Sequence, residues 1–583
     1  MQRTVVWKRF RALLTASVIL NGVDYAAGMA ECIIAGEFLG GEAVAGITLL
    51  SPVMPFLTFI GMLIVSGSMT LFSYASGRAD EEDMNRCLSQ AMTLCVGVGL
   101  FLTLVMFTAK DLILAYWDVS EEIAAHARAY FNGIAVRPPI YFLTQILISL
   151  LLVEGEVKRS LIAAATQFSV TVAASLFLCS HLGALGLSLG TTLGFTADLF
   201  VKGSYLFSKK CKLRPTIYVS LKKALEMLRL SFGMALADLW MALLPFAMTS
   251  YILAAFGEDA LIVFGVINSI MSVSIAVFQG VEQTMQPMVC LYSSEGNLCG
   301  LRKIMKISAG ASLAVGAVLS AVFMASSGSL PGLFGAANPS TAKLATTAII
   351  AFVPFLAARS LAMTYAAYFA YRDDVFYAAF LQMLIHFALP FSFAVGVGSA
   401  FGFTGVWAGL GASSLAALFA GVLLSRFAVW KSKGKLAGLL MLDREVLASQ
   451  FSFDFLITQD EVMETSHRVE KELLARNIDA DKSRKTAFFV EELGMNAVER
   501  QMQVGGANPS PCEAEVTVTT GDTITLVLRD AGEVVKSDED ADITNMDGRL
   551  SSFRMFVVSQ VASKLDYRSY IMLGGENRTM LRI

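Results

Sequence analysis

The sequence carries little charge and none of the usual metal-binding patterns. Charged residues make up 16% of the 583 residues, well below the share found in soluble proteins. The eight cysteines form no CxxC pair and no Cys/His cluster, so we interpret them as small buried apolar residues. The absence of a glycine-rich lysine loop excludes a P-loop ATPase as the driving element. The absence of a basic stripe with interleaved aromatics means that we expect no nucleic-acid partner.

Apolar residues, in contrast, are abundant. They make up 55% of the chain, with a mean hydropathy of +0.61. They fill about the first 430 residues, and about 140 residues of ordinary soluble composition follow a basic join at 431–435. The first part therefore predicts a lipid bilayer as its surroundings. The polar residues Asn21, Asp24 and Glu31 interrupt the N-terminal apolar run, which favours a first spanning helix over a cleaved signal.

Apolar windows of spanning length recur along the first part and predict an all-α polytopic membrane protein with twelve spans. We expect them at about 12–36, 43–76, 84–108, 123–153, 159–181, 184–207, 223–256, 260–293, 301–326, 342–371, 375–397 and 402–430. Basic residues gather in alternate loops, from Lys8 and Arg9 to Lys431 and Lys433. This asymmetry predicts an inner (plasma) membrane protein with both termini in the cytoplasm.

The two halves of the membrane part repeat each other. Pro138 corresponds to Pro354, and Gly186 to Gly405, at an offset of about 216 to 219 residues. Two parallel six-span repeats are typical of secondary transporters that bind substrate between their lobes. The expected domains are an N-lobe at 1–217, a C-lobe at 218–432, a linker at 433–445 and a cytoplasmic domain at 446–583.

Several short motifs in the membrane part resemble those of multidrug and toxic compound extrusion (MATE) transporters. They are Glu31–Gly40, Ala43–Pro52, Phe278–Gly280, Gln286-Pro287 and Tyr292. The resemblance implies an antiporter that exports drugs or organic cations in exchange for H⁺ or Na⁺. Lipid-linked oligosaccharide flippases share this superfamily fold, so a flippase stays an alternative.

Carboxylates inside the spans are the candidate ion-coupling groups, because buried charge in a membrane is costly and usually functional. Asp24 and Glu31 lie with Asn21 on one helical stripe. By resemblance, Glu31 takes the place of the family's coupling acid. Asp24 could serve in its place, and Asp198 in the sixth span could supply a second carboxylate. A structural hydrogen bond is the alternative role. The family's fifth-span Na⁺ ligands correspond to Thr171 and Ser175 here, which favours protons.

Polar residues of the C-lobe predict a substrate cavity. Four of them share one face of the eighth span, at i, i+3, i+4 and i+7: Gln279, Glu282, Gln283 and Gln286. Asp238 in the seventh span is expected to join them, and an acidic cavity suits organic cations. Arg137 and Arg359 hold similar places in the two repeats. They could bind carboxylates or phosphates in the cavity, or pair with Glu282 or Asp238.

After the join the periodicity changes to that of a small α+β sandwich. We expect a strand at 451–457, helices at 459–476 and 481–502, a hairpin of strands at 516–519 and 523–528, a helix at 555–565 and a last strand at 578–583. This order resembles the ATPase fold of histidine kinases and anti-sigma-factor kinases. Glu492 and Asn496-Ala497 match that family's helix signature, and Asp530-Ala531-Gly532 matches its Asp-x-Gly turn.

The resemblance implies roles in nucleotide binding. Glu492 would be the general base, Asn496 would hold Mg²⁺, and Asp530 and Gly532 would receive the adenine of ATP. Family glycines are missing at two places: Val534 stands where the family has a glycine, and Ser552-Phe553-Arg554 stands where it has Gly-x-Gly. A degenerate serine kinase domain, a regulatory domain that binds a cytoplasmic protein without nucleotide, and a membrane sensor acting on a sigma-factor pathway partner therefore remain open.

Overall fold

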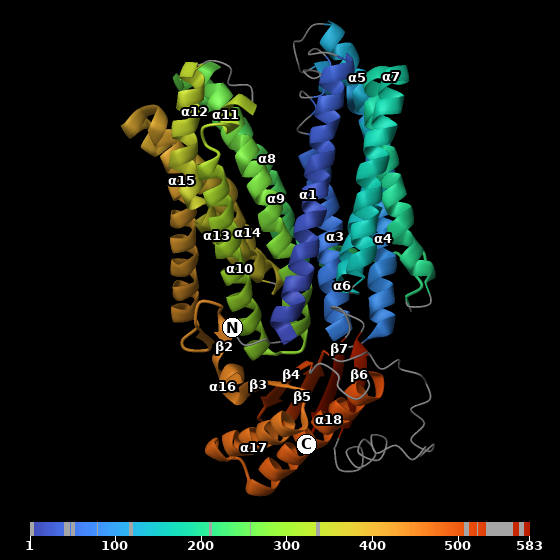
Figure 1. Ribbon diagram of the computed structural model, residues 1–583, viewed down its shortest axis with the longest axis vertical. Helices are drawn as coiled ribbons and strands as arrows, with labels where there is room; N and C mark the ends of the chain where they lie inside the picture. Colours follow the sequence, from blue (N-terminus) through green and yellow to red (C-terminus); the bar gives the residue numbers. More distant parts are fainter. Residues whose placement is uncertain are drawn as a thin grey trace.

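The chain folds into a helical membrane part, residues 5–431, and a smaller sheet domain, residues 450–583 (Figure 1). A computed structural model describes residues 5–39, 43, 47, 50, 53–77, 80–115, 121–154, 156–208, 211, 213–256, 258–333, 339–372, 374–505, 512–521, 523–531, 564–570 and 576–583. Both chain ends lie at the end of the membrane part that carries the sheet domain. We call this the sheet-side end.

The membrane part consists of helices, most of them long, joined by short connections. They are α1 (Val5–Leu39), α3 (Val53–Gly77), α4 (Glu81–Ala115), α5 (Glu121–Ala135), α6 (Pro138–Val153), α7 (Val157–Gly203), α8 (Leu221–Phe256), α9 (Glu258–Ser294), α10 (Leu298–Ala325), α11 (Leu330–Leu333), α12 (Pro339–Phe352), α13 (Leu356–Tyr371), α14 (Val375–Met383) and α15 (Leu389–Lys431). Among the described residues, eight helices are long and apolar enough to cross a membrane, and the bent pair α5 and α6 gives a ninth.

Two of these helices, α7 and α15, each turn back on themselves at a glycine. Gly183 in α7 has φ +59°, and Gly402 in α15 has φ +65°, a backbone region that only glycine enters freely. Beyond Gly183 the second arm of α7 runs back along the first arm. The two arms are in close contact, since a Cβ on Gly190 would lie 2.5 Å from the backbone nitrogen of Ser175. Gly409 approaches the first arm of α15 in the same way. Within the described residues, each expected window thus overlaps one helix, consecutive helices or one arm of such a hairpin.

The helices form two lobes, α1 and α3–α7 on one side and α8–α15 on the other (Figure 1). The lobes touch where α3 packs on α8 and α1 packs on α9. Tyr74 donates a hydrogen bond to the Tyr371 carbonyl across the lobes, at 3.0 Å, and Asn21 donates to Gln283 at 3.2 Å. Both contacts lie in the halves of these helices nearer the sheet-side end, where the lobes are therefore closed together.

The sheet domain follows a short connection that contains β1 (Leu436–Ala437), β2 (Leu442–Asp443) and α16 (Arg444–Ser449). Its elements are β3 (Gln450–Leu456), α17 (Gln459–Ala475), α18 (Ala480–Gly505), β4 (Glu513–Thr519), β5 (Thr525–Asp530), β6 (Lys564–Tyr570) and β7 (Glu576–Arg582). The five strands pair antiparallel in the order β3-β4-β5-β7-β6. The expected α+β arrangement is therefore confirmed for the described residues.

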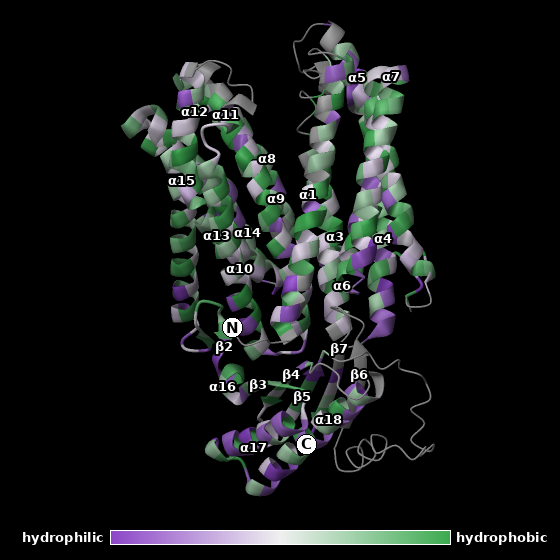
Figure 2. Cartoon of the chain, in the orientation of Figure 1, coloured by the Kyte–Doolittle hydropathy of each residue, from purple (hydrophilic) through white to green (hydrophobic). Residues whose placement is uncertain are grey.

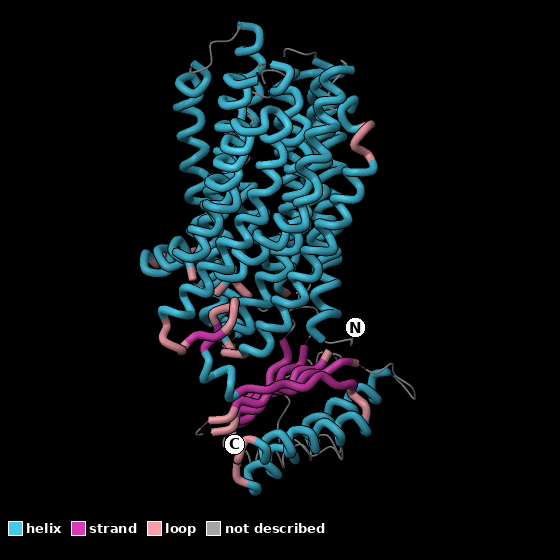
Figure 3. Tube along the Cα trace, turned by 90° about the vertical axis from the view of Figure 1, so that its left-hand side faces the viewer, coloured by secondary structure: helices cyan, strands magenta, loops and turns pink. Residues whose placement is uncertain are grey.

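The sheet forms a layer between the membrane part and the helices α17 and α18 (Figure 3). Alternate residues of β4 point to opposite faces. Val516 and Val518 are buried against α17 and α18 together with Val462 and Leu493, so this face is the core of the domain. Figure 2 shows hydrophilic residues concentrated on α17 and α18 and apolar residues on the helices of the membrane part.

The end of one expected helix is wrong. The helix predicted at 555–565 ends in residues that belong to strand β6, which pairs with β7 from Lys564 opposite Arg582 to Tyr570 opposite Glu576. Polar and apolar residues alternate from Lys564 to Tyr567, which is the period of a strand, and the pairing with β7 decides the conformation. Residues 555–563 lie outside the described residues.

Candidate functional site

The acidic group of the C-lobe consists of Glu282 and Asp238, and it lies beside the residues of α9 that contact α1. Glu282 on α9 is 6% exposed, and within the described residues its Oε1 has no hydrogen-bond partner. Asp238 on α8 interacts electrostatically with Glu282. Gln283 carries the hydrogen bond to Asn21 described above. The polar face expected on the eighth span thus reaches the boundary between the lobes, and Gln279 and Gln286 on the same face are half-buried.

The first-span acid lies inside the N-lobe. Glu31 on α1 is 8% exposed and accepts a hydrogen bond from the Tyr130 hydroxyl on α5, at 2.8 Å. This contact fits the structural role that the sequence left open, and it leaves room for ion exchange because Tyr130 is a neutral donor. Asp24 lies on the same helix, and its side chain falls outside the described residues.

Asp198 forms a second acidic site of the N-lobe, together with a lysine that sequence reasoning missed. Lys202 donates to Asp198 Oδ2 at 2.6 Å, and both side chains are almost fully buried, at 5% and 0% exposed. The spacing i, i+4 on one helix is the signal that would have found the pair. In the described part of the chain, Asp198 Oδ1 has no hydrogen-bond partner, and Asp198 lines a small cavity with Lys202, Thr144 and Gln167.

Within the described residues, the two arginines form no ion pair with Glu282 or Asp238, the alternative role that the sequence left open. Arg137 donates to the Ser188 carbonyl at 3.1 Å and to Thr192 at 3.3 Å, within the N-lobe. Arg359 is 2% exposed in the C-lobe. Among the described residues, no ion pair joins either arginine to Glu282 or Asp238. Arg137 therefore braces α7 against α6, and neither arginine neutralises the acidic group of α9.

Two expected nucleotide-binding residues of the sheet domain are brought together by a third. Arg500 on α18 donates to Asn496 at 3.1 Å and to Asp530 at 2.9 Å, and Asp530 ends strand β5 with 3% exposure. Glu492 lies one turn before Asn496 on α18, and Gly532 lies outside the described residues. Sequence reasoning did not single out Arg500.

This arrangement does not fit Mg²⁺ at Asn496 as it stands. The amide oxygen that would ligate the ion accepts a hydrogen bond from the Arg500 guanidinium, and that positive charge repels a cation. The Asp530 carboxylate that would receive adenine is paired with the same arginine. Both expected ligands therefore become available only when Arg500 moves.

Comparison with known sequences points to one transporter family. The family model MatE matches residues 21–178. The probable multidrug resistance protein NorM of Listeria monocytogenes serovar 1/2a is 25% identical over 155 residues, which are 25% of this chain and 33% of that protein. The probable multidrug resistance protein YoeA of Bacillus subtilis is 23% identical over 281 residues, 46% of this chain and 60% of its own. The chain thus matches only about a third of the length of the first of these relatives.

Solved structures extend the likeness to both lobes. A multidrug resistance MATE family transporter in an outward-facing conformation superposes with a TM-score of 0.69 at 19% identity, over 73% of this chain and 97% of its own. A MOP superfamily transporter from Pyrococcus furiosus, whose binding pocket is described as reversed in polarity, gives 0.68 at 18% identity, over 73% and 97%. At such identities the likeness concerns the fold alone. The membrane part has the MATE transporter fold.

Proposed function

We propose that the chain is a secondary efflux transporter for small organic cations in a bacterial plasma membrane, with the sheet domain in the cytoplasm. The observation that carries this proposal is the buried Glu282 beside Asp238 in the C-lobe of a MATE fold, next to Gln283, which contacts α1 of the other lobe. Two carboxylates in a water-poor site favour a cationic ligand over a neutral or anionic one. A lipid-linked phosphate would need free arginines, but Arg137 is held by the Ser188 carbonyl within the N-lobe, so the flippase is less well supported.

Efflux of a fluorescent organic cation tests this function. In inside-out vesicles that contain the full chain, an imposed proton gradient is expected to drive uptake of ethidium, and Glu282→Gln is expected to lower the rate by about tenfold or more, a loss of only about 1.4 kcal/mol of binding. Glu37→Gln is the matched control, because it makes the same change at an exposed carboxylate of α1. Equal rates for the two variants would contradict the assignment of Glu282.

The proposed coupling ion is a proton, exchanged at Asp198 and Glu31. Asp198 already holds the ammonium group of Lys202 in the N-lobe cavity, and this positive charge opposes a second cation beside the same carboxylate. A proton needs no coordination shell, so it can neutralise Asp198 while Lys202 stays charged. The neutral residues Thr171 and Ser175 on the first arm of α7 support the same choice.

Nucleotide binding by the sheet domain is also a proposal. The hydrogen bonds of Arg500 to Asn496 and Asp530 oppose it, because they occupy the expected ligands. Arg500→Ala is expected to raise the affinity of the full chain for ATP with Mg²⁺ by about tenfold, because it frees Asn496 and Asp530 from the guanidinium. Calorimetry on the detergent-solubilised chain measures this. Adding Asn496→Ala to the same variant is expected to remove the gain. Tighter binding by the unaltered chain than by Arg500→Ala would mean that Arg500 contacts the nucleotide itself.

A further inference from the structure

The face of the sheet turned toward the membrane part carries a row of charged residues. Asp454, Glu515, Arg529 and Arg578 stand directly opposite one another on β3, β4, β5 and β7, so their side chains share one face. The charge changes along the row from two acids to two arginines. Glu515 is 1% exposed, Arg529 2% and Arg578 6%. Such burial is costly unless each charge has a partner.

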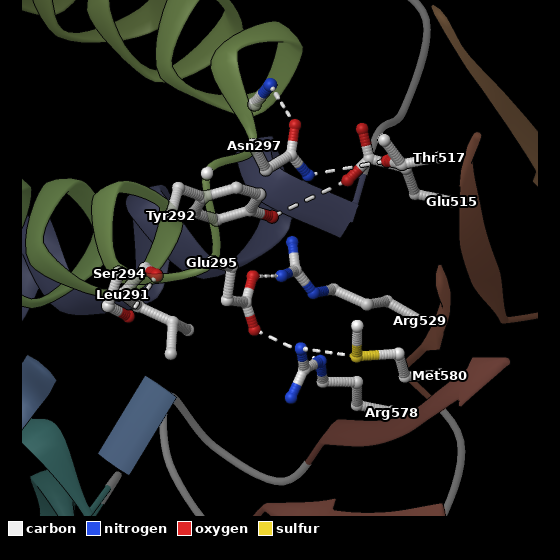
Figure 4. Close-up of polar contacts among 12 residues, drawn as sticks. Leu291, Tyr292, Ser294, Glu295, Asn297, Glu515, Thr517, Arg529, Arg578 and Met580 are labelled. Atoms are coloured by element: carbon white, nitrogen blue, oxygen red, sulfur yellow. Dashed lines mark hydrogen bonds and ion pairs between the residues drawn. The ribbon is translucent and has the colours of Figure 1, made fainter. Parts of the chain in front are cut away.

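The turn between α9 and α10 supplies the matching charges. Glu295, the residue after α9, forms ion pairs with Arg529 and with Arg578, the latter at 3.1 Å (Figure 4). Lys303 on α10 pairs with Asp454 at 2.8 Å and with Glu515 at 2.6 Å. The acid of the turn therefore meets the basic end of the row, and its lysine meets the acidic end.

Further contacts, other than ion pairs, fix the same turn in position. The Arg529 guanidinium lies over the Tyr292 ring, 4.1 Å from its centre, and Tyr292 donates to Glu515 at 3.4 Å (Figure 4). Asn297 donates to Thr517 at 3.3 Å and caps α10 through the Gly300 amide. These contacts lie beside the charged row on the same face, so the surface recognises the shape of the turn as well as its charge.

The other lobe reaches the same sheet. Lys8, in the first turns of α1, pairs with Glu513 on β4 at 3.3 Å. Lys8 is half exposed, so this pair alone contributes little stability. Its importance lies in its position, because it joins the sheet to the N-lobe while Glu295 and Lys303 join it to the C-lobe. The docked sheet thus spans both lobes at the end where they are closed.

The docked turn also connects the two candidate sites. Glu295 lies 13 residues after Glu282, and the continuous helix between them places the two about 20 Å apart at 1.5 Å per residue. On the sheet, Arg529 precedes Asp530, whose side chain points to the opposite face toward Arg500. Helix α9 and strand β5 therefore connect the Glu282 group with the Arg500 cluster, which consists of Arg500, Asn496 and Asp530.

We propose that this charged row is a docking surface for the α9–α10 turn, and that the docked sheet domain is a latch that favours the closed sheet-side end of the two lobes. The role of the latch in transport rests on the proposed function. Docking and lobe closure do not, since both can be measured without a substrate. Undocking, by a ligand of the Arg500 cluster or a cytoplasmic partner, would then release the lobes to open toward the cytoplasm.

Zero-length carbodiimide cross-linking of the full chain measures docking through native residues. In nanodiscs, mass spectrometry is expected to find Lys303 linked to Asp454 and Lys8 linked to Glu513 in the unaltered chain. Glu295→Arg places a third positive charge beside Arg529 and Arg578, and it is expected to lower both links at least fivefold. Arg302→Glu is the matched control, because Arg302 is an exposed charge next to Lys303. It is expected to leave both links unchanged.

Thiol alkylation measures lobe closure in the same samples. Ser231 is fully buried where α8 meets α3 and donates to the Leu63 carbonyl at 2.6 Å. The thiol introduced by Ser231→Cys is expected to react with a maleimide at least threefold faster when Glu295→Arg is added. Cross-links that persist in Glu295→Arg would overturn the docking surface. Cross-links that fall without faster alkylation would overturn the latch.

A paired reversal separates undocking from misfolding. Glu295→Arg combined with Arg529→Glu restores opposite charges across the contact, so it is expected to recover at least half of both cross-links and to slow alkylation again. A variant that is merely misfolded would not recover in this way. If neither the single nor the paired reversal yields folded protein, the milder Glu295→Gln is measured against the same control, with a smaller loss of the same links expected, and unchanged links would count against the docking surface.

Discussion

Replacing Asp198 with Asn is expected to abolish proton-coupled efflux and, because it leaves the buried Lys202 ammonium without its carboxylate, to lower the melting temperature of the chain as well. Asp198 is the carboxylate that the proposed exchange requires, and an amide of equal size cannot take up a proton at neutral pH. The expected loss of gradient-driven rate is about a hundredfold, or about 2.8 kcal/mol. Proteoliposomes loaded with a pH-sensitive dye measure it, because proton movement on addition of substrate should disappear together with efflux.

The partner lysine separates coupling from stability. Lys202→Met leaves Asp198 buried without its ion pair, and breaking such a pair is expected to cost about 3–5 kcal/mol. The double change Asp198→Asn with Lys202→Met removes both charges, so its melting temperature should return toward that of the unaltered chain while coupling stays lost. Proton movement that survives in the double variant would show that Glu31 or Asp24 carries the coupling alone.

The spans could be predicted because lipid imposes a simple rule on sequence. A helix must satisfy its own backbone hydrogen bonds in the bilayer, so every span appears as a long apolar window. The windows do not show which side chains contact one another. The pairs Lys202–Asp198 and Tyr130–Glu31 join residues whose contact depends on packing, and only the first has a helical spacing that sequence can reveal.

The sheet domain shows a similar limit. Its strands at 450–456 and 513–519 follow alternating patterns, and the alternation identifies the apolar core face correctly. The polar face reads as an ordinary solvated surface, because a pattern of period 2 reports which side a residue takes and not what covers that side. The burial of Glu515 and Arg529 beneath the α9–α10 turn therefore became visible only in the structure.

Gly67 should be the most sensitive glycine of the lobe contact. A Cβ at this position of α3 would lie 2.0 Å from the Met227 carbonyl oxygen of α8, so even alanine cannot be accepted without separating the two helices. Overpacking of this kind typically costs about 1–3 kcal/mol, and here the cost falls only on the state with closed lobes. Gly67→Ala is therefore expected to favour opening at the sheet-side end.

The same change elsewhere provides the control for Gly67. A Cβ on Gly97 in α4 meets nothing within 4 Å, and alanine is favoured over glycine in a helix by about 0.5–1 kcal/mol. Gly97→Ala should therefore leave the melting temperature unchanged or raise it slightly. Gly67→Ala should lower it, slow efflux about tenfold, and speed alkylation of the thiol introduced by Ser231→Cys. If both alanine variants behave alike, the α3–α8 contact does not form the closed state, and the proposed latch is contradicted.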